Sequence, residues 1–257
     1  MKIALFSDIH ANLPALEAFF ADVEKRNPDS IYCLGDLVGY NIWPNEVVNE
    51  IRKRRIPTIA GNYDFGIGRM SNECGCAYKT DAEKDNGNRF ISFTNSLMKD
   101  DERAYLRTLP AHIKVEFQLN EDKLNLLLVH GSPRKINEYL FEDREEKSML
   151  RIMEQADADI MCFGHTHKPY HRVLNSDIDG QDHFHHKVNI STVGKTKEND
   201  IRGGYVMLTV DENSSILNKE SISVEFIRFD YDFEKAAKAV EQSPLPNEYA
   251  ENLRCGY

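Results

Sequence analysis

Short apolar runs recur along the chain, and each stops abruptly at polar residues. The most regular runs have the length and composition of buried strands and cover residues 3–6, 31–34, 56–60, 124–129 and 160–163. In the first half of the chain, they alternate with segments whose apolar residues recur at helical spacing, as in residues 13–23. This alternation predicts parallel strand pairs joined by right-handed crossovers.

The second half of the chain returns to strands, several of them antiparallel in pattern. The predicted strands cover residues 112–118, 123–129, 159–163, 169–174, 184–190, 203–210 and 221–229, with a helix over about 146–156. A short amphipathic helix is expected over 232–242, followed by an irregular tail from Ser243. No repeat or low-complexity linker divides the sequence, so we expect one α/β domain, residues 1–257, with two packed sheets.

An insertion at about 64–108 interrupts this rhythm. It is rich in Gly, Asn, Asp and Lys up to residue 90, and a helical stretch is expected over about 91–107. The insertion lies between two strands that end in chemically competent residues, which places it to cover a site as a lid. A simple surface excursion explains the same composition, and both interpretations remain open.

The composition bounds the class of protein. Apolar residues make up 41% of the 257 residues, which is enough for a sizeable core. A formal charge of −10 disfavours non-specific binding to nucleic acid or anionic membranes. No stretch approaches the length of a membrane span, and the first apolar run ends too early, at Ser7-Asp8, for a signal peptide. We therefore expect a soluble, cytoplasmic protein with no membrane partner.

The five cysteines do not form an evenly spaced disulfide framework. Cys33 and Cys162 lie inside apolar runs and are expected to be small core residues. Cys74-Gly75-Cys76 is more closely spaced than the usual zinc motifs and has no second pair beside it. We interpret this tract as a loop feature, with metal binding as the second option.

Residues that can bind metal follow five of the predicted strands. They are Asp8-Ile9-His10, Gly35-Asp36, Gly61-Asn62, His130-Gly131 and Gly164-His165-Thr166-His167. Each motif alone is weak, because Asp and Asn commonly form caps and turns at such places. Five in succession are hard to explain by chance, and their carboxylate, imidazole and amide donors suit divalent ions. Because ligand sites of open α/β sheets lie at the carboxyl ends of the strands, the series predicts a two-metal hydrolase.

The same series resembles that of the calcineurin-like metallophosphoesterase superfamily. Its members carry the order Asp8-x-His10, Gly35-Asp36, Gly61-Asn62-x-Asp64, His130-Gly131 and Gly164-His165-x-His167. Residues 7–12 and 189–194 resemble the small bacterial and archaeal phosphodiesterase branch, and the resemblance runs from residue 1 to about 230. It implies an α/β fold of two packed mixed β-sheets flanked by helices, with two metals at the strand ends of a phosphoric ester hydrolase.

The resemblance also implies which residues bind each of the two divalent ions. The first ion would be bound by Asp8, His10 and His167, and the second by Asn62, His130 and His165. Asp36 would bridge the two ions, and a hydroxide held between them would attack phosphorus. Manganese, iron, nickel and zinc all accept these donors, so the identity of the metal stays open.

Catalytic roles are implied for Asp36, Asn62, Tyr63 and Asp64, and Tyr63 departs from the superfamily pattern. Members usually have a histidine at this position. A phenol has a reference pKa of about 10, so it can donate a hydrogen bond but brings no positive charge at neutral pH. We therefore expect substrates whose leaving group needs little protonation. Asp64 keeps the superfamily's acidic residue, but its role is open because there is no histidine to orient.

Residues near these motifs are further candidates for a substrate pocket. Tyr40 and Trp43 can stack on a base or an aryl group, although packing in the core or against a lid is favoured. Asn12 either reaches a phosphate oxygen or caps the first helix, and Arg134 either pairs with phosphate or is a solvated charge. The histidine-rich residues 183–186 are expected to form an exposed strand.

The sequence therefore favours a dinuclear-metal-dependent phosphoesterase that hydrolyses phosphodiester bonds of a small substrate, such as a nucleotide. The alternatives are a phosphomonoesterase or a nuclease of the same superfamily, or a non-catalytic metal-binding scaffold. The acidic balance argues against a nuclease, and the complete set of seven ligand positions argues against a scaffold. A small phosphoester is the expected partner, and no feature of the sequence indicates an oligomeric state.

Overall fold

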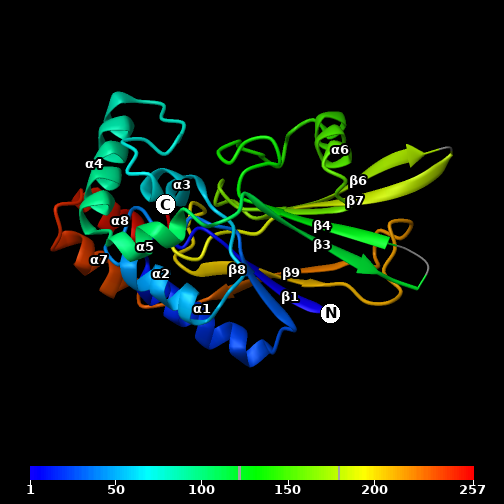
Figure 1. Ribbon diagram of the computed structural model, residues 1–257, viewed down its shortest axis with the longest axis horizontal. Helices are drawn as coiled ribbons and strands as arrows, with labels where there is room; N and C mark the ends of the chain where they lie inside the picture. The colour runs from blue at the N-terminus through cyan, green and yellow to red at the C-terminus, as the bar shows by residue number, and fades with distance from the viewer. Residues whose placement is uncertain (121–122, 179) are drawn as a thin grey trace.

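The computed structural model describes residues 1–120, 123–178 and 180–257. It is an α/β structure in which two mixed β-sheets are packed together and flanked by helices, which confirms the predicted fold class (Figure 1). The first sheet has the order β2-β1-β8-β9 and consists of β1 (Lys2–Phe6), β2 (Ser30–Cys33), β8 (Gly203–Thr209) and β9 (Ser223–Phe229). In it, β1 pairs parallel with β2 and antiparallel with β8.

The second sheet has the order β3-β4-β5-β7-β6. Its strands are β3 (His112–Gln118), β4 (Lys123–Val129), β5 (Ile160–Phe163), β6 (Tyr170–Ile178) and β7 (Gln181–Asn189). The central strands β4, β5 and β7 run parallel, and β3 and β6 pair antiparallel at the two edges. The carboxyl ends of the parallel strands therefore lie at one edge of this sheet.

The prediction of a strand over residues 56–60 is wrong. This run joins the first sheet only through a single bridge between Thr58 and Cys33. Pro57 has no backbone N–H and so cannot donate to a ladder, although its carbonyl accepts from Cys33 N at 3.0 Å. The chain then leaves the sheet, because Ala60 N donates to Pro110 O at 2.8 Å.

Alternate residues of β1 point to opposite faces of the first sheet, and both faces are buried. Ile3 and Leu5 pack between the two sheets against side chains such as Leu126 of β4. Ala4 and Phe6 pack on the outer side, against α1 (Leu13–Arg26) and α2 (Pro44–Lys53). On the far side of the second sheet lies α6 (Glu146–Gln155), whose buried residues are Met149, Ile152 and Met153 (Figure 1).

The insertion contains α3 (Asn62–Gly68), α4 (Asp81–Leu97) and α5 (Asp100–Leu106). The single helix expected over about 91–107 is therefore wrong: α4 starts earlier and ends at Leu97, before α5 begins. Asn45 fixes this break, because its Nδ2 donates to Leu97 O at 2.8 Å and its Oδ1 accepts from Lys99 N at 2.9 Å. The lid role of the insertion stays a prediction.

The prediction of an irregular tail from Ser243 is also wrong. After α7 (Phe233–Glu241), residues 247–255 form α8 (Asn247–Cys255). Tyr249, Ala250 and Leu253 form its buried face, and they pack in one cluster with Ala236 and Val240 of α7. Tertiary packing of this short apolar face, more than intrinsic helix propensity, stabilises α8.

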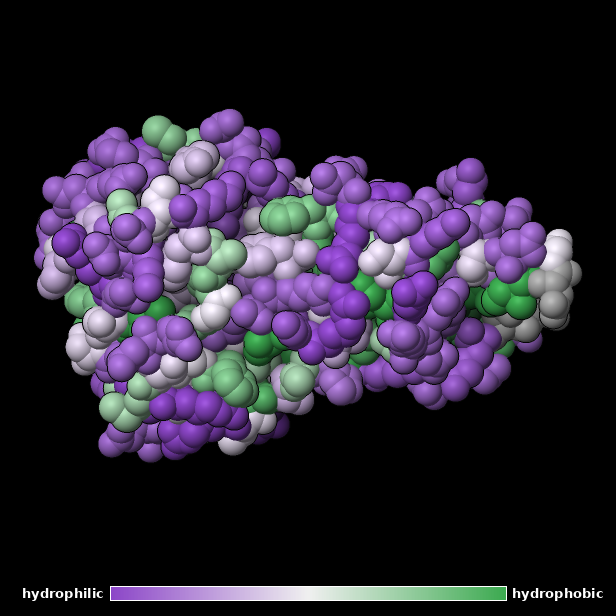
Figure 2. All heavy atoms as spheres, turned by 90° about the horizontal axis from the view of Figure 1, so that it is seen from above, coloured by the Kyte–Doolittle hydropathy of each residue, from purple (hydrophilic) through white to green (hydrophobic). Residues whose placement is uncertain are grey.

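The histidine-rich strand over residues 183–186 is β7, but it is not the exposed strand that we expected. His186 is fully buried, because β7 lies between β5 and β6 in the sheet. On the face of the molecule shown in Figure 2, hydrophilic residues predominate and hydrophobic residues gather in small groups. Among the described residues, no helix combines the length and apolar character needed to span a bilayer.

Candidate metal centre

The predicted ligands meet at the carboxyl ends of four strands. Asp8 and His10 follow β1, Asp36 follows β2, His130 follows β4, His165 and His167 follow β5, and Asn62 opens α3. All of these side chains are buried. The structure thus collects seven polar groups, far apart in the sequence, in one interior site at the edge of both sheets.

The first group of donors consists of Asp8, His10 and His167. Their ligand atoms all lie within 4.8 Å of one another. His167 Nε2 lies 3.2 Å from Asp8 Oδ1, and His10 Nε2 lies 3.8 Å from the same oxygen. This is the set that the sequence assigned to the first ion.

The second group consists of Asp36, His130 and His165, again with their ligand atoms within 4.8 Å of one another. Asn62 belongs to it, because its Oδ1 lies 3.1 Å from His130 Nε2. Asp36 Oδ2 lies 3.4 Å from His130 Nε2 and 3.7 Å from His10 Nε2 of the first group. Asp36 therefore stands between the two groups, as a bridging ligand must.

The hydrogen bonds of two histidines show that the first group fits a cation. His10 Nδ1 donates to Val38 O at 3.2 Å, and His167 Nδ1 donates to Lys195 O at 2.5 Å. Burial lowers the pKa of both imidazoles, which are therefore neutral and keep a lone pair on Nε2. These two Nε2 atoms face each other at 3.2 Å, an arrangement that a metal ion between them would satisfy.

Buried polar atoms without a hydrogen-bond partner also indicate that both groups fit cations. Asp8 Oδ1 and His165 Nε2 are buried and have no hydrogen-bond partner among the described residues. Burial, and then the charge of His130, lowers the pKa of His165 to about 3, so its ring stays neutral. Unsatisfied buried polar atoms are rare in proteins and need a reason, which a pair of cations would supply.

His130 differs from the other histidines. Burial opposes its protonation, but the Asp36 carboxylate outweighs this effect and raises the pKa of His130 to about 10. Its Nδ1 donates to Leu34 O at 2.8 Å, which fixes the ring with Nε2 toward Asp36 and Asn62. A metal ion at the second group would therefore displace a proton from His130.

The backbone that delivers the ligands is strained. The φ angles are 54° at Asp8, 50° at His10, 52° at Asp36, 65° at His165 and 60° at His167. This left-handed region is unfavourable for residues other than glycine, at about 1 kcal/mol or more each. Hydrogen bonds between the loops hold it in place, including Asp8 N to Gly35 O at 2.9 Å and His10 N to Asp36 O at 3.0 Å. Such strain is typical of functional sites.

Two glycines allow close approach to the carboxylates. A Cβ atom at Gly61 would overlap Asp36 Oδ1, and a Cβ atom at Gly164 would overlap Asp8 Oδ2. Both positions therefore exclude every other residue as long as the carboxylates keep their places.

Tyr63 and Asp64 form hydrogen bonds that hold the candidate ligands and their loops in place. Tyr63 N donates to Asp36 Oδ1 at 2.9 Å, and burial raises the pKa of the Tyr63 phenol well above its ordinary value. Asp64 accepts from Leu37 N and from Gly61 N, each at 2.9 Å. Asp64 thus ties the loop of Asp36 to the loop of Asn62, which gives a positioning role to the residue whose role was open.

The other sequence candidates do not form a polar substrate pocket. Asn12 caps α1 by accepting from Ala15 N at 3.2 Å, and Arg134 pairs with Glu138. Tyr40 is half-buried, with its ring 4.8 Å from the His10 ring, and Trp43 packs with the cluster of α7 and α8. The packing interpretation of the aromatic residues is therefore the better supported.

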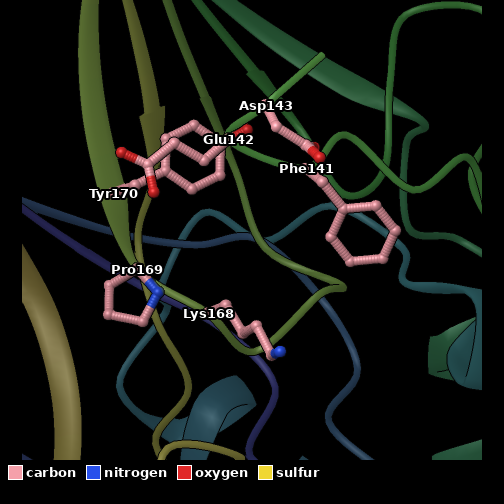
Figure 3. Close-up of a pocket in the computed structure, with 6 residues that line it drawn as sticks. All are labelled: Phe141, Glu142, Asp143, Lys168, Pro169 and Tyr170. Carbon is pink, nitrogen blue, oxygen red and sulfur yellow. The ribbon is translucent and has the colours of Figure 1, made fainter.

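Residues that the sequence analysis missed also border the centre. The Tyr139 ring lies 4.1 Å from the His165 ring, and the carbonyl of Lys195 binds His167. Lys168, next to His167, lines a surface pocket of about 420 Å³ together with Phe141 and Tyr170 (Figure 3). None of these residues follows a strand directly, so no motif marked them.

Two mixed sheets with paired groups of carboxylate and imidazole donors at their strand ends define an α/β protein with a candidate dinuclear metal centre. The chain belongs to the calcineurin-like phosphoesterase superfamily, whose domain model matches residues 1–213. Membership indicates a metal-dependent hydrolase of phosphoesters.

Individual proteins are similar to this chain over nearly its whole length. The chain is 28% identical to the uncharacterized protein MJ0912 of Methanocaldococcus jannaschii, over 99% of this chain and 98% of that protein. Its fold is similar to that of a metallophosphoesterase from Sphaerobacter thermophilus, with a TM-score of 0.73, 24% identity and coverage of 100% and 99% of the two chains. It is also similar to the hypothetical protein PH1004 of Pyrococcus horikoshii, with a TM-score of 0.74, 20% identity and coverage of 100% and 98%.

Proposed function

We propose that this protein is a phosphoesterase that depends on two divalent metal ions and hydrolyses phosphodiester bonds of a small substrate, such as a nucleotide. The observation that supports this most is the position of Asp36, whose Oδ2 lies 3.7 Å from one donor group's His10 and 3.4 Å from the other's His130. This position would allow one carboxylate to bind two ions at once. Manganese, iron, nickel and zinc all suit these donors.

The residues around the centre have distinct tasks in this proposal. Bound cations would supply Lewis acidity and offset charge on the phosphate. Asp36 is held in place by Tyr63 N, and Asn62 turns its amide oxygen toward the second group. The Tyr63 phenol stays neutral because burial raises its pKa, so it offers no charged acid to a leaving group. This favours substrates with a good leaving group.

Hydrolysis of bis(p-nitrophenyl) phosphate after loading with each metal tests the proposal. We expect metal-dependent release of nitrophenol that falls to background in Asp36→Ala, while Asp101→Ala, at an exposed position in α5, retains activity. The panel includes p-nitrophenyl phosphate, cyclic nucleotides and single-stranded DNA, which separates diesterase, monoesterase and nuclease activities. Protein that binds two ions but hydrolyses no phosphoester would refute the proposal.

We further propose that the insertion over residues 64–108 covers the centre. Asn62 Nδ2 lies 2.7 Å from Cys74 O, and the Phe90 ring of α4 lies 4.8 Å from the Tyr40 ring, which in turn contacts His10. Limited proteolysis checks this: cleavage within 64–108 should slow when manganese and phosphate are bound, and an unchanged rate would contradict a lid.

A further inference from the structure

Two lysines lie in the loop that connects β7 to β8, close to the candidate metal centre. Lys195 and Lys197 follow Gly194, whose N–H donates to Asp8 O at 3.0 Å. Lys195 O accepts the hydrogen bond from His167 Nδ1, and Lys195 N donates to Thr192 Oγ1 at 3.1 Å. The loop is therefore fastened to the first donor group by backbone contacts, which hold both lysines beside it.

The Lys195 ammonium lies at the side of the centre where the aromatic residues gather. Its Nζ is 4.8 Å from the centroid of the Tyr40 ring and 5.9 Å from that of Tyr249. The Tyr40 ring lies 5.0 Å from the Tyr63 ring and 4.8 Å from the His10 ring. The Tyr40 ring therefore contacts both the Lys195 ammonium and the ring of Tyr63, whose phenol is neutral.

Lys197 lies in the same loop, two residues after Lys195, and its side chain is also half-buried. The loop that is fastened to the first donor group at Gly194 and Lys195 therefore carries a second lysine.

Neither lysine has an anionic partner among the described residues. Both side chains are half-buried, yet neither forms an ion pair or donates a side-chain hydrogen bond within the described parts of the chain. Contact with the Tyr40 ring offsets only part of the desolvation of Lys195, because a cation–π contact is weaker than a charge-paired hydrogen bond. Two half-buried cations without a partner among the described residues would be stabilised by a bound anion.

We propose that Lys195 and Lys197 form an anion-binding site that holds the phosphate of the substrate against the metal centre. This inference rests on the proposed function. It specifies an anionic phosphoester, whose oxygens that point away from the metals would receive hydrogen bonds from the two ammonium groups. The lysines would thereby supply positive charge near Tyr63, which is neutral and stands where the superfamily usually has a histidine.

Four variants test the site: Lys195→Met, Lys197→Met, Lys195→Arg and Lys219→Met. Methionine removes the charge but keeps an unbranched chain, and arginine keeps the charge. Lys219 is the control, because it is 58% exposed in the loop between β8 and β9, at the opposite end of the first sheet. The measurements are the Kd of inorganic phosphate for the manganese-loaded protein by calorimetry, the metal content, and kcat and KM on bis(p-nitrophenyl) phosphate.

Each methionine variant at the site should bind phosphate about 10- to 100-fold more weakly, because a charged hydrogen bond is lost. Metal content should stay unchanged, Lys195→Arg should retain most of the affinity, and Lys219→Met should match the wild type. Equal phosphate affinity in all variants would overturn the inference. So would a loss of melting temperature in Lys195→Met with no change in Kd or KM, since that result marks a purely structural cation.

The outcome is separable from that of the proposed function. If the wild-type protein hydrolyses no phosphoester, the proposed function fails, but the phosphate Kd still reports on the lysines. If Lys195→Met does not fold, Lys197→Met and Lys195→Arg decide the question, because neither removes the charge that packs against Tyr40.

Discussion

Asn62 donates a hydrogen bond from its side-chain Nδ2 to the backbone carbonyl of Cys74, with the two atoms 2.7 Å apart. Because the amide nitrogen is engaged there, the amide oxygen must turn the other way, toward His130 Nε2 at 3.1 Å. A carbonyl of the insertion thus sets the orientation of a candidate metal ligand. This relationship gives the Cys74-Gly75-Cys76 tract a positioning role that needs neither thiol.

Replacing Asn62 should empty the second metal position. Asn62→Leu keeps the branched shape of the side chain but removes its oxygen donor, so the second ion should bind at least about tenfold more weakly. Metal analysis after gel filtration should show a fall from two ions per chain to one. Asn213→Leu, at an exposed position in the loop after β8, serves as the control and should retain both ions. Two ions retained by Asn62→Leu would exclude Asn62 as a ligand.

Adding one methyl group at Gly61 should disturb the centre without removing any ligand. The φ of Gly61 is −87°, which alanine adopts freely, so any effect of Gly61→Ala comes from overlap with Asp36. We expect reduced metal content and a loss of about 1–3 kcal/mol of stability, measured by urea unfolding.

Gly180→Ala is the control, because it should lose stability through backbone strain without losing metal. A Cβ atom there meets no atom of the described residues within 4 Å, but the φ of +83° strains alanine. This variant should lose about 1 kcal/mol and keep its metals. If Gly61→Ala retains full metal content, the close contact with Asp36 is not needed for binding.

The buried pair His171 and His186 should make stability depend on pH. His186 is fully buried; its Nδ1 lies 3.0 Å from His171 Nε2, and its own Nε2 has no partner among the described residues. Burial, and then His171, lowers the pKa of His186 from 6.5 to about 4. Between these values the unfolded chain binds a proton that the folded chain does not, so stability is lost as the pH falls.

For His186 the shift corresponds to about 3 kcal/mol, at 1.36 kcal/mol per pH unit. The difference in unfolding free energy between the wild type and His186→Phe, measured with urea in the presence of EDTA, should therefore change by about this amount between pH 7 and pH 4 in favour of the variant. The other histidines are present in both proteins, so the comparison is directed at His186 and its contact with His171. A difference that is constant with pH would contradict the assignment.

The C-terminal helix should be essential for stability. Tyr249 is 3% exposed, its ring lies 5.2 Å from the Phe90 ring, and its hydroxyl accepts from Asn41 Nδ2 at 2.9 Å. Tyr249→Ala should cost about 3–5 kcal/mol, because it opens a cavity and removes one of the two hydrogen bonds that Asn41 Nδ2 donates. Calorimetry should show a melting temperature lower by about 6–20 °C.

Tyr257→Ala is the matched control, because Tyr257 is 68% exposed beyond the same helix. Its stability should lie within about 0.5 kcal/mol of the wild type. Similar melting temperatures for the two variants would mean that α8 is only loosely attached.

The sequence by itself determined which residues stand at the strand ends. The strands before Asp8, Asp36, His130 and His165 are short and mostly apolar, and the ligands follow within a few residues, so the information is local. It also determined the fold class, because strand and helix patterns depend on neighbours in the chain. Where local pattern was misleading, packing decided: α8 forms because Tyr249 and Leu253 are buried against α7.

Only the tertiary structure decided how the centre is assembled. His10 finds its carbonyl partner at Val38, His167 at Lys195, and Asp8 O is bound by Thr192, which is 184 positions away. Such contacts depend on the packing of two sheets and leave no periodic trace in the sequence. The same holds for Lys195 and Lys197, which resemble any pair of loop lysines until the fold fastens their loop to His167 and Asp8.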